Sequence, residues 1–316
     1  QLIVKTDIAS FTLSSDLLKD YSLKQDDILK LNIKEGALED ANNRKVIEVS
    51  ISINDETKGF EKLDRPMMIS IHYEAPALEL EKHENFLVEV INKDGKKTPI
   101  FNSLYDPNTK TVRLSTDQLG KVSVSYIYKT FSDLGDQSWA KESIEVLASK
   151  GIINGTSLQE NTFSPKENIS RADFVVLLIK TLNLSQMPEI NNNFADIPSN
   201  AYYYESIGIA KALGITSGVG DNQFNPKGYI SRQDMMVLTA NALAAIDKGL
   251  SLKNEDVLEN FKDKDSISSY AAESLATLVD NNLIGGHNER INPLGNSTRA
   301  ETAVFMHRIF KNLYSN

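Results

Sequence analysis

Three four-residue stretches, Ser170-Arg171-Ala172-Asp173, Ser231-Arg232-Gln233-Asp234 and Thr298-Arg299-Ala300-Glu301, decide the fold of the second half of the chain. Each tetrad consists of a hydroxyl residue, an arginine, a variable residue and an acid, and an apolar run with helical spacing follows it. The hydroxyl is suited to cap the free amides of a helix start, and the acid three residues later completes a capping box. The arginine falls at the first helical position, where the aligned amides attract negative charge. The tetrads therefore predict three helices and a repeated anion site.

Length and composition are those of an ordinary globular protein. The 316 residues suffice for two domains, or for one domain followed by a repeat array. The hydrophobic share of 41 % and the charged share of 24 % are typical values. The chain has no apolar run near the roughly 20 residues of a membrane-spanning helix, and it has no basic, apolar leader. We expect no membrane insertion, and we expect Gln1 to be a cut inside a longer protein or a processed end.

Charge and cysteine content exclude several classes of function. The formal net charge of -9 disfavours nucleic acid as the main partner, although a local arginine at a helix start can still hold an anion. The absence of cysteine removes disulfides, thiol catalysis and thiolate metal sites. The four histidines are scattered, and no nucleophile or metal motif accompanies them. We expect this chain to have no enzyme activity, no cofactor and no metal.

Residues 1–128 show the alternation of antiparallel strands. Apolar and polar residues alternate with period two, which is typical of sheets packed on one face. The alternating segments are 29–34, 47–53, 67–73 and 122–128. Asp94-Gly95 indicates a hairpin and Asp106-Pro107-Asn108 a second turn, while a short helix is expected near Ser15. The pattern predicts an antiparallel β-sandwich of seven to nine strands over 1–128.

From Phe131 onward the chain repeats a longer unit three times. Each copy has an entry aspartate, an aromatic residue that opens a helical stretch, a glycine turn, a proline step and the tetrad. The aspartates are Asp133, Asp196 and Asp263, the aromatics Trp139, Tyr202 and Tyr270, and the turn glycines Gly155, Gly218 and Gly286. The aspartate precedes the tetrad arginine by 38, 36 and 36 residues. This spacing predicts repeats at 131–193, 194–260 and 261–316.

The closing helix of each copy carries one apolar stripe. The stripes consist of Ala172, Val176, Ile179 and Leu182, then Gln233, Val237, Ala240 and Leu243, then Ala300, Val304, His307 and Phe310. Two helices per unit cannot bury such a stripe alone, so the three units must pack together. Three copies favour a closed, all-α, pseudo-threefold arrangement over an open solenoid. We interpret His307 as a packed histidine.

These motifs resemble the S-layer homology domain in its three-copy form, and the resemblance covers 131–316. The family pattern has an F-x-D entry, an aromatic-led helix, a G-I-x-x-G turn, an F-x-P step and an I-T-R-A-E helix start. The first copy shows it as Phe131 and Asp133, Trp139, Gly151–Gly155, Phe163 and Pro165, and Ile169–Asp173. Residues 1–128 are similar to the β-rich module that often precedes such repeats in bacterial surface proteins.

The resemblance implies a non-covalent anchor. Family members form a three-pronged spindle around a central three-helix bundle and bind secondary cell-wall polysaccharide of Gram-positive envelopes. The ligand is often a pyruvate ketal on a terminal N-acetylmannosamine, held in grooves between adjacent repeats. A carboxylate ketal suits an arginine at a helix start. The candidate site residues are Arg171, Arg232, Arg299, Asp133, Asp196, Asp263, Gly155, Gly218, Gly286, Ser170, Ser231, Thr298 and Trp139.

Structural roles for the same residues stay open at this point. Each arginine could pair only with a neighbouring acid at the surface, which is worth about 0–1 kcal/mol. The entry aspartates could cap the first helix or hold the neighbouring repeat. The three aromatics could stack on a sugar, but their position in the family favours the core. Gln233, Lys264 and Asn282 depart from the family pattern. These departures predict that one or two grooves carry most of the affinity for the glycan.

Two readings of the function follow. The first is a wall-anchoring module of a larger secreted surface protein, with cell-wall polysaccharide or another peptidoglycan-linked glycan as partner. The second is a structural S-layer segment, in which the sandwich makes protein–protein contacts by self-association and the repeats attach it.

Overall fold

The computed structural model describes residues 2–13, 26–36, 45–58, 62–184 and 192–315. The helix expected near Ser15 lies outside these ranges. The chain divides into two compact units, and each is described by itself. The first unit contains Gln1–Lys129 together with Glu145–Gly151, and the second contains Thr130–Ile144 and Ile152–Asn316.

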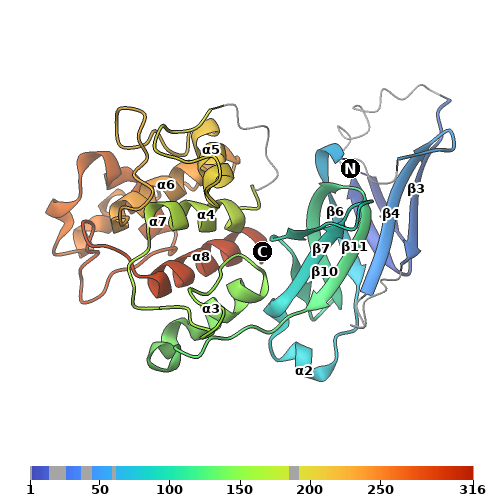
Figure 1. Cartoon of the computed structure of the whole chain (residues 1–316), viewed down its shortest axis with the longest axis horizontal. Coiled ribbons are helices and arrows are strands. Elements are labelled where there is room, and N and C mark those ends of the chain that lie inside the picture. Colours follow the sequence, from blue (N-terminus) through green and yellow to red (C-terminus); the bar gives the residue numbers. More distant parts are fainter. Residues whose placement is uncertain (1, 14–25, 37–44, 59–61, 185–191, 316) are drawn as a thin grey trace. The chain divides into compact units, whose positions relative to one another are not determined.

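The first unit is built on two antiparallel sheets (Figure 1). One sheet has five strands in the order β1-β2-β6-β10-β9. Its strands are β1 (Leu2–Lys5), β2 (Ala9–Leu13), β6 (Lys62–His72), β9 (Leu104–Asp106) and β10 (Thr111–Gln118). The other has the order β3-β4-β11-β7-β8, and β5 also pairs with β4. Its strands are β3 (Leu29–Glu35), β4 (Lys45–Ile53), β5 (Glu56–Lys58), β7 (Phe86–Ile91), β8 (Lys97–Ile100) and β11 (Gly120–Tyr126). Helix α2 (Ala77–Leu80) and the short η1 (His83–Asn85) connect β6 to β7.

The alternating residues of both sheets meet in one core. Met67, Ile69 and Ile71 of β6 belong to the same buried cluster as Val122 and Val124 of β11. The antiparallel strands and both turns are confirmed, because β7 pairs with β8 and β9 with β10. The predicted number of strands was too low, since the described residues contain eleven. The difference comes from β1, β5 and β9, which have three or four residues and are too short for period two to be visible.

A fully buried lysine from the segment Glu145–Gly151 lies in this unit. Lys150 is 0 % exposed, and its Nζ donates to the carbonyl oxygens of Phe86 at 3.2 Å and Ser103 at 2.7 Å. Burial lowers the pKa of Lys150 to about 7, and the charge of Glu84 opposes this shift. The folded unit therefore releases a proton that the unfolded chain still holds at alkaline pH.

We expect Lys150→Met to remove a pH dependence of stability. Because the folded pKa is lowered, wild-type stability should rise by about 1.4 kcal/mol per pH unit from about pH 7 toward the unfolded pKa. The variant lacks this term, so its advantage over wild type should be largest below pH 7 and shrink by pH 9. Hydrogen exchange of the β7 and β11 amides, corrected for intrinsic rates, reports opening of this unit. A difference between the two proteins that does not change with pH would contradict the prediction.

The second unit is mainly helical, with short 3-10 turns. The α-helices are α3 (Ser138–Ser149), α4 (Arg171–Thr181), α5 (Tyr204–Ala212), α6 (Arg232–Ala245), α7 (Ala272–Asp280) and α8 (Arg299–Tyr314). The 3-10 turns are η2 (Gly135–Gln137), η3 (Glu255–Asn260), η4 (Lys264–Ser266) and η5 (Ser269–Ala271). The last turn of α3 falls in the segment that belongs to the first unit.

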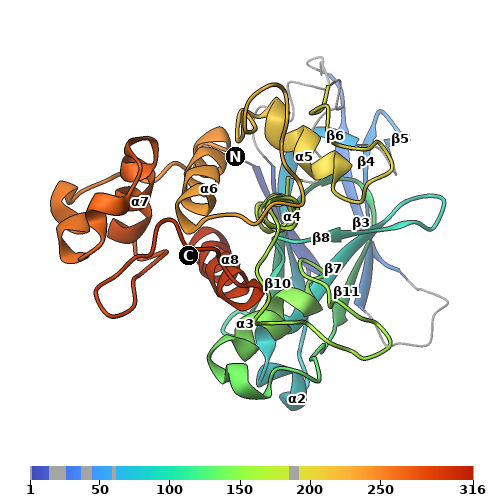
Figure 2. The ribbon, with the colours of Figure 1, turned by 60° about the vertical axis from the view of Figure 1, so that its left-hand side comes forward.

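Helices of successive repeats pack on one another. The three closing helices begin at the tetrads, and α4 contacts both α6 and α8 (Figure 2). The first helix of the next repeat covers two of the closing helices, because α5 packs on α4 and α7 on α6. Between α8 and α3, His307 Nδ1 lies 3.0 Å from Ser143 Oγ. His307 is 4 % exposed, which confirms the interpretation as a packed histidine.

The segments before the closing helices pair with one another. Three isolated bridges join Asn168 to Thr298, Ser170 to Tyr229 and Ser231 to Asn296. Ile169, Ile230 and Ser297 occupy equivalent positions in these segments, and all three are at most 1 % exposed. The Ser297 hydroxyl has no hydrogen-bond partner in the part of the chain that the structure describes. A buried polar group without a partner costs stability.

We expect Ser297→Val to stabilise the second unit by about 1 kcal/mol, because it buries two methyl groups and removes an unpaired hydroxyl. Ser297→Ala should give a smaller gain, since it only removes the hydroxyl. The urea midpoint of the helical circular dichroism signal measures both. An unchanged or lower midpoint for Ser297→Val would contradict the prediction.

Candidate functional site

The tetrad hydroxyls cap the closing helices as predicted. The cap bonds run from the amides of Asp173, Asp234 and Glu301 to the hydroxyls of Ser170 at 3.0 Å, Ser231 at 3.2 Å and Thr298 at 3.2 Å. The reciprocal bond of a capping box is present in α8, where the Thr298 amide donates to Glu301. In α4 the shorter Asp173 side chain instead accepts from the Ser170 hydroxyl at 2.7 Å and the Tyr202 hydroxyl at 2.5 Å.

The amides at the helix starts are bound by the neighbouring repeat, and this corrects one expectation. The first two helical amides of each closing helix donate to backbone carbonyl oxygens of the next repeat around the ring. The pairs are Arg171 and Ala172 to Gly228 and Pro226, Arg232 and Gln233 to Gly295 and Pro293, and Arg299 and Ala300 to Glu167 and Pro165. Since the hydroxyl cap satisfies the third amide, these amides are not available to an anion. The predicted contribution of helix amides to an anion site is wrong.

The arginines bind in the same cyclic order. The Nε of each donates to a carbonyl oxygen of the proline step of the next repeat. These bonds are Arg171 to Phe224 at 3.1 Å, Arg232 to Ile291 at 2.9 Å and Arg299 to Phe163 at 2.8 Å. The bonds lead from repeat 1 to repeat 2, from repeat 2 to repeat 3, and from repeat 3 back to repeat 1. The arginines are thus more than surface partners of their own acids.

Each guanidinium is largely buried and faces an acid of the next repeat. Arg171 Nη1 lies 3.7 Å from Asp234, and Arg232 Nη1 lies 3.8 Å from Glu301. Burial lowers the pKa of Arg171, Arg232 and Arg299, while the nearby carboxylates act in the opposite direction. An arginine keeps its proton in proteins despite such shifts. The Nη groups therefore stay charged although the guanidiniums are largely buried.

The entry aspartates have a structural role that neither sequence-based alternative described. Each carboxylate accepts from two successive amides at the proline step of its own repeat. The acceptor–donor sets are Asp133 with Phe163 and Ser164, Asp196 with Phe224 and Asn225, and Asp263 with Ile291 and Asn292, all between 2.7 and 3.0 Å. They neither cap the first helix nor hold a neighbouring repeat. These bonds fix the carbonyl that receives the arginine.

The turn glycines make room for the protein itself. A Cβ on Gly155, Gly218 or Gly286 would lie 2.3 to 2.5 Å from a backbone carbonyl oxygen. It would also lie 2.5 to 2.8 Å from the ring of Phe131, Phe194 or Phe261, respectively. The glycine thus permits the entry phenylalanine to pack against the turn.

The aromatics are exposed, which contradicts the expectation of a core position. Trp139 is 56 % exposed, Tyr202 71 % and Tyr270 60 %. The Tyr270 hydroxyl donates to Asp234 at 2.8 Å, as Tyr202 does to Asp173. Although the rings are exposed, desolvation at the hydroxyl, the hydrogen bond to the carboxylate and the charge of that carboxylate raise the pKa of both tyrosines. The Trp139 indole instead donates to Gln137 at 3.0 Å. It therefore does not bind Glu301, the tetrad acid that lines the same groove.

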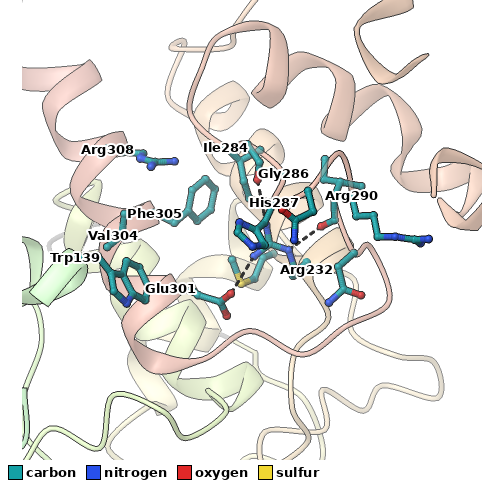
Figure 3. A pocket seen from close by; sticks show the side chains of 15 residues that line it. Trp139, Arg232, Ile284, Gly286, His287, Arg290, Glu301, Val304, Phe305 and Arg308 are labelled. Atoms are coloured by element: carbon teal, nitrogen blue, oxygen red, sulfur yellow. Dashed lines mark hydrogen bonds and ion pairs between the residues drawn. The ribbon is translucent and has the colours of Figure 1, made fainter. Parts of the chain in front are cut away.

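These groups come together in two grooves of the second unit. We call the first the Arg232 groove, which has a volume of about 550 Å³ and includes Arg232, Gly286, Glu301, Trp139 and Arg308 in its lining (Figure 3). The Arg171 groove has a volume of about 420 Å³ and includes Arg171, Gly218, Asp234 and Tyr270. Each combines an arginine, the glycine turn and acid of the next repeat, and an aromatic of the third. At the equivalent third position, Arg299 Nη2 donates to the Asn154 carbonyl at 3.0 Å.

The two grooves differ in charge. Three arginines and one glutamate line the Arg232 groove, whereas one arginine and one aspartate line the Arg171 groove. Arg308 and Phe305 were not among the residues expected from the sequence. Their position seven and four residues after Glu301, on one face of α8, is the signal that could have found them.

Comparison with known proteins finds the same threefold repetition. The family profile of the S-layer homology domain matches residues 130–175, 193–236 and 260–303. The chain contains three tandem S-layer homology domains. Each matched segment of an S-layer homology domain ends four residues after the tetrad arginine, so it includes the groups that form the cyclic contacts.

Relatives carry similar stretches within much longer chains. An amylopullulanase of Thermoanaerobacterium thermosulfurigenes is 25 % identical over 98 % of this chain and 16 % of its own length. An exoglucanase of Acetivibrio thermocellus is 32 % identical over 58 % of the chain and 16 % of its own. The surface-layer 125 kDa protein of Lysinibacillus sphaericus is 27 % identical over 55 % of the chain and 14 % of its own. The chain thus spans about a sixth of these relatives. In the described part of the chain, no helix combines the length and apolarity needed to cross a bilayer.

Proposed function

We propose that the second unit is a non-covalent anchor that binds secondary cell-wall polysaccharide outside a Gram-positive cell. Its repeats, at 131–193, 194–260 and 261–316, form a closed pseudo-threefold assembly, and the inter-repeat grooves hold the glycan. The observation that carries the proposal is the Arg232 groove, where a charged guanidinium, an open aromatic ring and a glycine turn line one cavity. The family match supports this role.

The proposed ligand group is the pyruvate ketal of a terminal N-acetylmannosamine. Its carboxylate would pair with the Nη groups of Arg232, in a charge-assisted bond of about 1.5–3 kcal/mol. The exposed face of Trp139 would stack on the apolar side of the sugar. The entry aspartates, turn glycines and tetrad hydroxyls do not contact the ligand in this proposal and instead support the residues that do. Their bonds and packing hold the carbonyls and turns that position the arginines.

The grooves are proposed to contribute unequally, with the Arg232 groove first and the Arg171 groove second. Tyr270 already binds the acid of the Arg171 groove, and the Asn154 carbonyl already binds Arg299 Nη2. In the Arg232 groove, the corresponding contact of Nη2 with the Gly285 carbonyl is longer, at 3.4 Å. The Arg232 groove is ranked first because three arginines and one glutamate line it, whereas one arginine and one aspartate line the Arg171 groove.

The whole protein is proposed to be a secreted surface protein, and the part outside this chain is proposed to be an exported polysaccharide-degrading enzyme and not a lattice subunit. The alignment with the amylopullulanase covers 316 residues and so includes the sandwich. The alignment with the surface-layer protein covers 179 residues, too few for both units. Self-assembly without cell wall, seen by electron microscopy, would favour the S-layer alternative.

Calorimetric titration of the full chain with a pyruvylated N-acetylmannosamine fragment tests the function. We expect one or two sites, and binding should be lost when the pyruvate is removed. Three equal sites would contradict the unequal grooves. Unchanged binding of the fragment without pyruvate would contradict the assignment of the ligand group.

A further inference from the structure

The Arg232 groove continues along α8 beyond the pair formed by Arg232 and Glu301. Glu301, Val304, Phe305 and Arg308 all line it, and they share one face of the helix. Figure 3 shows Glu301 beside Arg232, with Phe305 and then Arg308 farther along the groove. Seven residues of α-helix separate Glu301 from Arg308, a rise of about 10 Å. The groove is therefore longer than one sugar ring.

Arg308 lies at the far end of the Arg232 groove and is a cation without an ionic partner among the described residues. Its side chain is exposed, and among the described residues it has no hydrogen bond or ion pair. In Figure 3 its guanidinium points past the Phe305 ring, whereas the side chain of Arg290 extends away from Arg232 and Glu301. The far end of the cavity thus carries positive charge with no protein carboxylate beside it in its lining.

The Arg171 groove provides an internal comparison. Counting seven residues from its acid Asp234 along α6 leads to Asn241, which also lines that groove. Asn241 is neutral, and its amide donates to the Ile215 carbonyl at 3.1 Å. The cation at the far end is therefore a property of the Arg232 groove and is not required by the repeat architecture.

We propose that Arg308 binds a second anionic group, a phosphate or a carboxylate, on the sugar next to the one held at Arg232. This inference rests on the proposed function and extends it. The Arg232 groove would bind two adjoining sugars that each carry one negative charge. The apolar surface of Phe305 and Val304 would lie between Arg232 and Arg308. The Arg171 groove would bind a single charged sugar.

Three disaccharides test this assignment by titration of the full chain. Each has a pyruvylated N-acetylmannosamine at its end, and the second sugar is neutral, a 6-phosphate or a uronic acid. We expect wild type to bind at least one of the two anionic disaccharides about 10-fold more tightly than the neutral one, because a charge-assisted bond contributes about 1.5–3 kcal/mol. The phosphate and uronate probes show which group is preferred.

Two variants separate a site from a general attraction. Arg308→Asn reproduces the Arg171 groove and should abolish the preference, so that the variant binds the neutral and the anionic disaccharides with the same affinity. Arg290→Asn removes the same charge from a side chain that points away, so it should keep the preference. Equal losses in both variants, or no preference in wild type, would overturn the proposal. If no disaccharide binds, the proposed function itself fails and this inference fails with it.

Discussion

Gly218→Ala should destabilise the second unit by about 3–5 kcal/mol, whereas Gly214→Ala should cost only about 1–2 kcal/mol. Both glycines have positive φ, 81° for Gly218 and 69° for Gly214, so an alanine is strained at either position. They differ in the space around them. A Cβ on Gly218 would lie 2.3 Å from the Gln223 carbonyl oxygen, while a Cβ on Gly214 would have no heavy atom within 4 Å.

The pair isolates steric overlap from backbone strain, because each variant adds one methyl group to the same turn. Urea unfolding followed by helical circular dichroism measures both costs. The first unit provides an internal reference, since hydrogen exchange of its β7 amides should be unaffected. Equal destabilisation by the two substitutions would mean that the turn opens to accept the Gly218 side chain. In that case the packing of Phe194 on this glycine would not be essential to the fold.

Arg232→Gln should lower the affinity of the full chain for purified cell walls by about 30- to 100-fold. Loss of one charge-assisted bond to the carboxylate corresponds to roughly 2–3 kcal/mol, at about 1.4 kcal/mol for each factor of ten. Glutamine is chosen because its amide can still donate to the Ile291 carbonyl, which Arg232 Nε binds at 2.9 Å. The repeat interface should therefore survive the substitution.

The same substitution at the other two tetrads supplies matched controls. Arg171→Gln should have a smaller effect, and Arg299→Gln the smallest, because Arg299 Nη2 is already bound to Asn154. A co-sedimentation assay on walls with and without pyruvate measures the three variants, and thermal unfolding shows that each is folded. If Arg232→Gln sediments like wild type, the Arg232 groove is not the main site. Equal losses at all three positions would contradict the ranking.

Local patterns predicted much of this molecule because they depend on short stretches of chain. Alternation with period two identified the longer strands, and the tetrads identified the starts of α4, α6 and α8. The short strands β1, β5 and β9 escaped notice, since three or four residues show no period. The reciprocal capping bond was expected in every tetrad. Among the described residues it is present between Thr298 and Glu301. Asp173, one methylene shorter, binds the Tyr202 hydroxyl instead.

The sequence by itself determined that the chain has a strand-rich half and three copies of one helical unit, because periodicity and repetition are written along the chain. Only the tertiary structure decided what the tetrads do. Arg299 reaches the carbonyl of Phe163, which lies 136 residues away in the sequence, and no local pattern encodes that pairing. The helix amides bind the neighbouring repeat for the same reason, since backbone donors left open at a helix start take whichever acceptor the fold brings to them. This long-range pairing directs the Nη groups of Arg232 into a groove, and it gives the entry aspartates a structural role.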